Sequence, residues 1–129
     1  MSGRYLLDTN VIIALFAQEP SIVQRMMQAQ EVFVPCIALG ELYYGARRSR
    51  RVAQNLAAID EFATSSSVLS CSMETAQEYG SIKNALRERG RPIPENDIWI
   101  AAIARQHGLV LVTRDTHFDA IDSFESEVW

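Results

Sequence analysis

The stretch R-Y-L-L-D-T-N-V-I-I-A-L, residues 4–15, decides the fold. Residues 5–7 form a short, continuous apolar run, which predicts a strand in a parallel sheet that is covered on both faces. Directly after it, the apolar residues of 11–16 recur at helical spacing, and Asn10 is a candidate N-cap for that helix. A buried strand that passes at once into a helix predicts a βα unit.

Asp8 lies where the predicted strand ends. In open α/β sheets, ligands bind in the crevice at the carboxyl ends of the strands, so this carboxylate is placed for chemistry. Aspartate is also common in βα loops for a local reason, because its side chain caps the backbone of the following turn. Asp8 alone is compatible with either role, and the decision depends on whether other acids converge on it.

The chain of 129 residues, 48% of them hydrophobic, is of the size of one compact domain. It has no apolar run of about 20 residues, as a membrane-spanning helix requires, and its N-terminus lacks the pattern of a secretory signal. We therefore expect a cytoplasmic protein. Cys36 and Cys71 are far apart in sequence and adjoin apolar residues, which favours buried free thiols over a disulfide or zinc site. His107 and His117 do not change this interpretation.

The alternation of apolar patterns continues along the whole chain and predicts right-handed βαβ units. We expect an α/β fold, with a central, mostly parallel sheet of four to five strands and helices on both faces. Further strands are predicted at 32–34, 68–69, 109–112 and, at an edge, 128–129. Helices are predicted from Pro20, over 36–46, from Val52 to Phe62, over 72–89, and from an Asn96 cap to Ala104.

Two apolar stripes give the expected buried faces. Ala76, Tyr79, Ile82 and Leu86 should form the inner face of the long helix. Ile22, Val23, Met26 and Met27 should be core as well, although methionines also suit an adaptable surface for a partner.

Four acids occupy apolar or element-terminal positions: Asp8, Glu41, Asp97 and Asp115. Glu41 has Ile37 and Ala38 one turn before it and Tyr44 one turn after it, so its face of the helix should point inward. A buried carboxylate is costly unless a cation or an arginine lies beside it. Several gathered carboxylates become reasonable when they share a hard divalent cation, because Mg²⁺ and Mn²⁺ prefer oxygen ligands.

Four motifs in order along the chain carry a family resemblance: L-L-D-T-N at 6–10, G-E-L-Y-Y-G at 40–45, N-D-I-W-I-A-A at 96–102 and T-R-D-T-H-F at 113–118. The sequence resembles the PIN-domain ribonucleases, most closely the VapC toxins of type II toxin–antitoxin systems. The resemblance implies a single PIN domain over residues 1–129. It also implies that the four acids form the catalytic, metal-binding quartet, with Asn10 and Thr113 as supporting polar residues.

The activity implied by this resemblance is the hydrolysis of an RNA phosphodiester, in tRNA or ribosomal RNA, by metal-activated water. Mg²⁺ would be the cofactor, with Mn²⁺ able to substitute, and the partners would be a VapB-type antitoxin and a second copy in a homodimer. The net charge of −4 argues against binding RNA through bulk charge, yet 11 of the 12 basic residues are arginines and they cluster. Candidates for the flanking phosphates are Arg47, Arg48, Arg50, Arg51, Arg87, Arg89 and Arg91, although solvated helix-end arginines explain each one equally well.

Three alternatives compete with this interpretation, and the first of them is discounted. Phosphatases of the haloacid dehalogenase type also place an aspartate after the first strand, but they use a second aspartate two residues later, where this chain has Asn10. A PIN-fold module that binds RNA or protein without cutting would be expected to lack some of the four acids. A housekeeping PIN nuclease without an antitoxin would keep them all.

Overall fold

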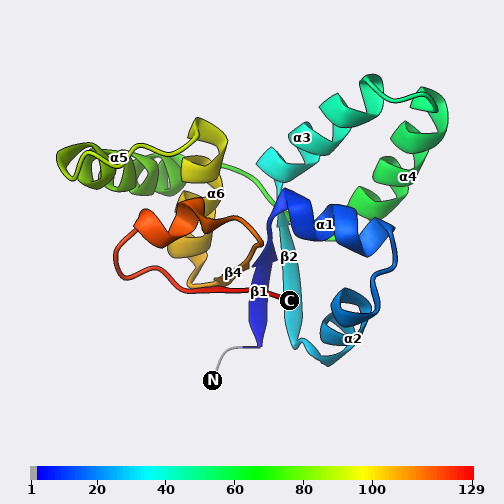
Figure 1. Ribbon diagram of the computed structural model, residues 1–129, viewed down its shortest axis with the longest axis horizontal. Helices are drawn as coiled ribbons and strands as arrows, with labels where there is room; N and C mark the ends of the chain where they lie inside the picture. Colours follow the sequence, from blue (N-terminus) through cyan, green and yellow to red (C-terminus); the bar gives the residue numbers. More distant parts are fainter. Residues whose placement is uncertain (1–2) are drawn as a thin grey trace.

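Five parallel strands form one sheet in the order β3-β2-β1-β4-β5 (Figure 1). This is a computed structural model, which describes residues 3–129. The strands are β1 (Arg4–Leu7), β2 (Glu31–Pro35), β3 (Ser67–Leu69), β4 (Val110–Val112) and β5 (Ser126–Glu127). The expected α/β class, the parallel sheet and the weak edge strand near the C-terminus are confirmed, with β5 two residues earlier than predicted.

Helices cover both faces of this sheet (Figure 1). They are α1 (Thr9–Phe16), α2 (Pro20–Gln28), α3 (Cys36–Arg47), α4 (Val52–Thr64), α5 (Met73–Glu88), α6 (Glu95–His107) and the 3₁₀ helix η1 (Thr116–Ala120). Within residues 3–129, none of these helices combines the length and the apolar character needed to cross a membrane.

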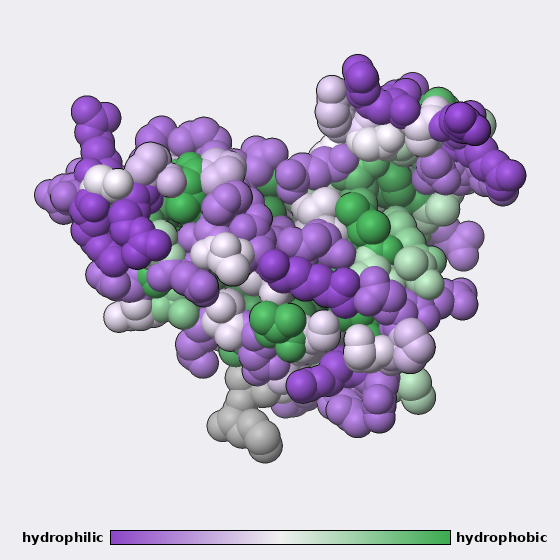
Figure 2. All heavy atoms as spheres, in the orientation of Figure 1, coloured by the Kyte–Doolittle hydropathy of each residue, from purple (hydrophilic) through white to green (hydrophobic). Residues whose placement is uncertain are grey.

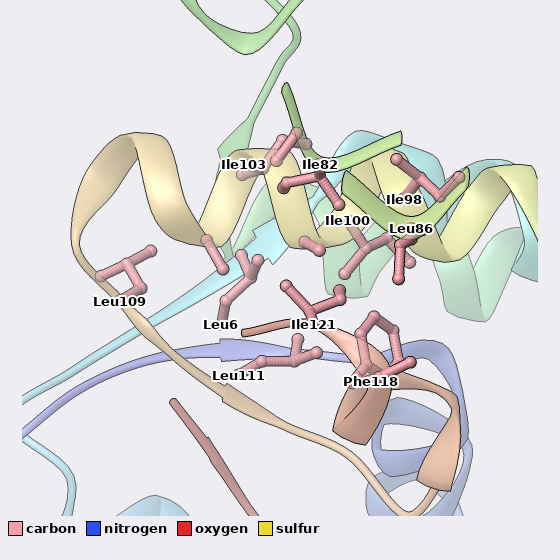
Figure 3. Close-up of a cluster of buried hydrophobic side chains, with 14 residues drawn as sticks. Leu6, Ile82, Leu86, Ile98, Ile100, Ile103, Leu109, Leu111, Phe118 and Ile121 are labelled. Carbon is pink, nitrogen blue, oxygen red and sulfur yellow. The ribbon is translucent and has the colours of Figure 1, made fainter. Parts of the chain in front are cut away.

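Alternate strand residues supply the two cores. Leu6 and Leu111 are completely buried and pack with α5, α6 and η1, as Figure 3 shows. Their neighbours Leu7 and Val112 are also completely buried, but they pack on the other face with α1 to α4. Because successive strand residues point to opposite faces, burial on both sides requires the continuous apolar runs seen in the sequence.

The strand order reverses between β1 and β4. The chain moves outward from β1 through β2 to β3 and then crosses back to place β4 on the other side of β1. Leu7 pairs with Val112, and the Asp8 N–H donates to the Val112 carbonyl at 2.9 Å. The residues that follow these two strands are therefore neighbours at the topological switch point, where α/β folds bind ligands.

The expected helix caps are wrong at two positions. Asp8, not Asn10, is the N-cap of α1, because its carboxylate is the one that accepts the Thr9 N–H. Helix α6 begins at Glu95, after Pro94, so Asn96 lies inside its first turn. In contrast, the Ser72–Thr75 capping box at the start of α5 forms with both reciprocal hydrogen bonds.

The inner face of α5 differs from the expected one at its first turn. Ile82 and Leu86 are buried, but Ala76 is exposed and the neighbouring Thr75 is completely buried. The Thr75 hydroxyl donates to the Gln106 side chain of α6, which satisfies its polar group inside the protein. Hydropathy favours alanine over threonine, so a pattern of apolar residues cannot find this contact.

The α2 stripe and the cysteines are also less buried than expected. Ile22 is fully buried, whereas Met27 is 82% exposed, so Met27 is not a core residue. Both cysteines are free thiols, as predicted, but Cys36 is half-buried and Cys71 is exposed. Partial burial and the neighbouring Cys36 thiol raise the pKa of Cys71, which keeps it protonated at neutral pH.

Candidate active site

Asp8 is buried, with 4% of its surface exposed, and both of its carboxylate oxygens are held. Oδ1 accepts the Thr9 N–H at 2.8 Å, and Oδ2 accepts the Thr113 hydroxyl at 2.7 Å. The Asn10 amide lies 3.4 Å from Oδ2. Asp8 is thus a helix cap and a site residue at once, and the two roles posed as alternatives are served by one carboxylate.

Thr113 and Asn10 tie the ends of β1 and β4 together. Besides donating to Asp8, the Thr113 hydroxyl accepts the Asp115 N–H at 3.0 Å. The Asn10 side-chain oxygen accepts the Arg114 N–H at 3.2 Å. The structure therefore places both supporting residues between Asp8 and the loop that carries Asp115, which fixes the relative position of the two acids.

Glu41 approaches the same place from α3. Its carboxylate accepts the Thr9 hydroxyl at 2.6 Å, one residue from Asp8. The side chain is only half-buried, and Tyr44, one turn later, is 67% exposed. Its face of α3 is therefore the wall of an open groove and not, as expected, an inward-looking face.

Asp97 and Asp115 meet at His117. The His117 Nδ1 lies 2.9 Å from Asp97 Oδ2 and 3.0 Å from Asp115 Oδ1, and the Asp115 carboxylate also accepts the His117 N–H at 2.9 Å. One ligand atom from each of these three side chains lies within 4.8 Å of the others. Sequence reasoning set His117 aside, although its place two residues after Asp115 was the available signal.

Burial and the negative charges of neighbouring carboxylates raise the pKa values of Asp8 and Asp97. Burial raises the pKa of Asp8, and the negative charges of Glu41 and Asp115 raise it further, against the hydrogen bonds from Thr113 and Thr9. Burial likewise raises the pKa of Asp97, with Asp8 and Asp115 adding to the shift and His117 opposing it. All four carboxylates therefore share one electrostatic environment.

The donor set fits a divalent cation. Among the ion pairs formed within residues 3–129, none brings a lysine or arginine to these four acids. The only basic side chain paired with them in that set is His117, which is charged only when it is protonated. The four carboxylates gather at the carboxyl end of the sheet, and no guanidinium in that set neutralises them. Their oxygens are hard ligands of the kind that Mg²⁺ and Mn²⁺ bind.

The site lies in a hollow between two lobes. Figure 2 shows a hollow between the α5–α6 side and the hairpin of α3 and α4, with hydrophilic surface at the tips of both lobes, and in Figure 1 strand β1 ends below this hollow. The candidate arginines are all exposed and follow α3 or end α5. Arg89 is already engaged, since it pairs with Asp122 at 2.9 Å and donates to the Ala120 carbonyl at 2.8 Å. The other six have no such anchor to η1.

If these acids bind the metal ion of an RNA-cleaving enzyme, as the family resemblance implies, replacing Thr113 by valine should slow RNA cleavage about 10- to 100-fold, the usual cost of losing a residue that orients a metal ligand. Valine keeps the shape but removes the hydroxyl shared by Asp8 and Asp115. Thr113→Ser keeps that hydroxyl and is the matched control. Cleavage rates measured at saturating metal test this prediction. Equal rates for Thr113→Val and wild type would exclude an orienting role for Thr113.

Comparison with known proteins adds a family to this geometry. The family model described as PIN domain matches residues 5–123. The chain is 37% identical over 129 residues to "Ribonuclease VapC2" of Haemophilus influenzae, covering 98% of each chain. It is 32% identical to "tRNA(fMet)-specific endonuclease VapC" of Shigella flexneri, again over 98% of each.

A solved structure agrees with these relatives. A chain in the crystal structure of DNA-bound VapBC from Salmonella typhimurium superimposes with a TM-score of 0.90 at 31% identity. The match covers all of this chain and 99% of that one. The fold therefore agrees with that of the solved structure over nearly the whole length of both chains.

Proposed function

The chain belongs to the PIN-domain family, and on this premise we propose that residues 1–129 form a single domain that hydrolyses RNA phosphodiesters at Asp8, Glu41, Asp97 and Asp115. It is an endoribonuclease of the VapC type, the toxin of a toxin–antitoxin pair. The observation that supports the choice of residues is the convergence of these four acids, from four separate elements, at the switch point of the sheet.

The residues divide the work as follows. Asp8, Asp97 and Asp115 would hold a divalent ion, with Glu41 acting directly or through water. Bound there, the ion supplies Lewis-acid activation of water and neutralises charge that develops at phosphorus. We propose Mg²⁺ as this ion, with Mn²⁺ able to substitute. No side chain needs to act as a covalent nucleophile, and Thr113 and Asn10 keep the carboxylates oriented.

The substrate is RNA, and we propose a structured RNA such as tRNA or ribosomal RNA. Exposed arginines lie at the α3–α4 turn and around the end of α5, which are the outer ends of the two lobes in Figure 1. From there they can contact the phosphates that flank the scissile bond. Such contacts fix the position of the RNA strand relative to the acids. Arg47, Arg48, Arg50, Arg51, Arg87 and Arg91 are available for this, whereas Arg89 first has to leave Asp122.

The partner is an antitoxin of the VapB type, as in the VapBC complexes that share this fold. We propose that it covers an apolar groove between α1, α3 and α4, which we call the α1 groove. The α1 groove is lined by Thr9, Ile13, Phe16, Glu41, Leu42, Gly45, Ala46, Asn55, Ala58 and Ile59. It contains Glu41, so a segment lying in it could insert a basic side chain among the acids.

We propose the α1 groove, in place of most of the apolar stripe on α2, as the surface that binds the partner. Ile22 is fully buried and cannot touch a partner, although Met27 is 82% exposed. We also propose that two copies of the chain pair as a homodimer, each with its own antitoxin. Sedimentation of the purified complex measures this stoichiometry.

The product ends test the mechanism. If water attacks phosphorus, cleavage leaves a 5′-phosphate and a 3′-hydroxyl, and the ribose 2′-hydroxyl takes no part. An RNA with a single 2′-deoxy substitution at the cut site should therefore be cut within about threefold of the normal rate, since a nucleophile's loss would cost far more. Mass spectrometry of the fragments identifies the ends. A 2′,3′-cyclic phosphate would contradict the mechanism.

Growth tests the toxin role. Expression of the chain alone should arrest growth, and co-expression with its antitoxin should restore it. Normal growth with soluble protein that cuts RNA in vitro would instead indicate a housekeeping nuclease. Normal growth with protein that binds RNA without cutting it at any metal concentration would indicate a non-catalytic module.

A further inference from the structure

His117 faces the acid cluster although nearly half of its side chain is exposed. Its Nδ1 atom lies 2.9 Å from one Asp97 oxygen and 3.0 Å from one Asp115 oxygen, so the same nitrogen contacts both carboxylates. An exposed histidine that makes no specific contact is free to rotate its ring into water. Here the ring is turned toward the two acids.

The backbone around His117 fixes this position. Asp115 caps the start of η1 by accepting the His117 N–H at 2.9 Å. The next residue, Phe118, is 1% exposed and belongs to the core formed with α6 (Figure 3). His117 therefore sits between a capped turn and a buried aromatic anchor, which leaves its side chain little freedom to move away from Asp97.

The two distances from His117 Nδ1 to the carboxylate oxygens match the ligand spacing of a coordination shell, and all three ligand atoms lie within 4.8 Å of one another. In an octahedral site with metal–ligand bonds of about 2.1 Å, adjacent ligand atoms lie about 3 Å apart. Nδ1 stands at 2.9 and 3.0 Å from its two oxygen neighbours. The same atoms that make hydrogen bonds without an ion can thus bind one ion with small movements.

We propose that His117 is a ligand of the divalent ion, together with Asp97 and Asp115, and that it makes this position bind Mn²⁺ more tightly than Mg²⁺, with Mg²⁺ remaining the ion proposed for catalysis. The inference rests on the proposed function, since it concerns an ion in the same site. Its chemical basis is that imidazole suits transition metals, whereas Mg²⁺ prefers oxygen ligands and keeps its waters. The four acids alone would give no such preference for a nitrogen-binding ion.

His117→Gln separates a ligand from a merely positioning residue, with His107→Gln as the matched control. Glutamine retains a polar side chain but removes the imidazole nitrogen, and His107 lies in the last turn of α6, away from the Asp97 end. Metal binding to protein stripped of ions is measured by calorimetry, and the ligand nitrogen by pulsed electron paramagnetic resonance of bound Mn²⁺.

The wild type should bind Mn²⁺ about tenfold more tightly than Mg²⁺ and show an imidazole nitrogen coupled to Mn²⁺. His117→Gln should lose this coupling and weaken Mn²⁺ about 10- to 100-fold, while Mg²⁺ changes by less than about threefold. His107→Gln should match the wild type in both measurements. If His117→Gln does not fold by circular dichroism, His117→Asn replaces it.

Two results would overturn the proposal: a wild-type Mn²⁺ spectrum without nitrogen coupling, or equal loss of both metals in His117→Gln. The second would show that His117 only positions the acids. Failure of the proposed function has a different signature, because then neither ion binds to the wild type or none of its RNA substrates is cut in either metal.

Discussion

Asp8→Asn is expected to reduce RNA cleavage at least about a thousandfold while leaving the fold intact. Asp8 is the most central of the four acids, since it contacts Thr113 and feels the charges of Glu41 and Asp115. A metal ion supplies several kcal/mol of transition-state stabilisation, and a loss of about 4 kcal/mol corresponds to a thousandfold in rate. Asparagine can still cap α1, so the helix keeps its start.

The same substitution should stabilise the metal-free protein at neutral pH. Because the pKa of Asp8 is raised above its usual 3.8, its contribution to stability is complete below pH 3.8 and is lost as the pH rises through the folded-state value. At pH 7.5 the buried charge therefore lowers the free energy of unfolding, and asparagine removes that charge.

Melting temperatures at pH 7.5, in chelator and in Mg²⁺, measure both effects together with the cleavage rate. Wild type should gain stability from Mg²⁺ and Asp8→Asn should gain little, because only a folded state with its ligands binds the ion. Asp119→Asn makes the same chemical change at an exposed position of η1 and should behave as wild type. An Asp8→Asn protein that cleaves normally would rule out Asp8 as a metal ligand.

Ile13→Asn is expected to weaken inhibition by the antitoxin about 30-fold or more, with cleavage by the free toxin nearly unchanged. Ile13 is 54% exposed on α1 and lines the α1 groove. Burial of such an apolar anchor at an interface contributes about 2 kcal/mol or more, and 2 kcal/mol corresponds to about 30-fold in affinity. The neutral asparagine adds no charge beside the RNA site.

Met27→Asn is the matched control, because Met27 is the most exposed apolar residue of α2. Titration of antitoxin into a cleavage assay gives the inhibition constant for each variant. The opposite outcome, with Met27→Asn insensitive to antitoxin and Ile13→Asn inhibited normally, would move the docking surface from the α1 groove to α2.

Most of the fold was predictable because burial on both faces leaves a direct record in the sequence. Leu6 and Leu7 have to be apolar together, since they face two different cores. Burial of a polar side chain that hydrogen-bonds to a specific partner cannot be recognised from the pattern of apolar residues. Thr75 is buried because Gln106 of α6 accepts its hydroxyl, a contact between residues 31 apart.

The positions of Asp8 and Asp115 after strands β1 and β4 were predictable for a similar reason, because both acids stand where apolar runs stop. What the sequence could not show is how they are held. Nothing in the spacing of residues 97 and 117 indicates that His117 turns toward Asp97, since this depends on the placement of α6 beside the loop after β4. The tie from Thr113 to Asp8 joins residues 105 apart and exists only once β1 and β4 pair.

The central position of β1 has a consequence for the timing of activity during synthesis. β1 can pair with β2 as soon as residues 31–35 leave the ribosome, but its other edge stays open until β4, residues 110–112, arrives. Asp115 follows only after that. The growing chain therefore cannot bring its four acids together before residue 115 has been synthesised, so the order of the strands delays the assembly of the site.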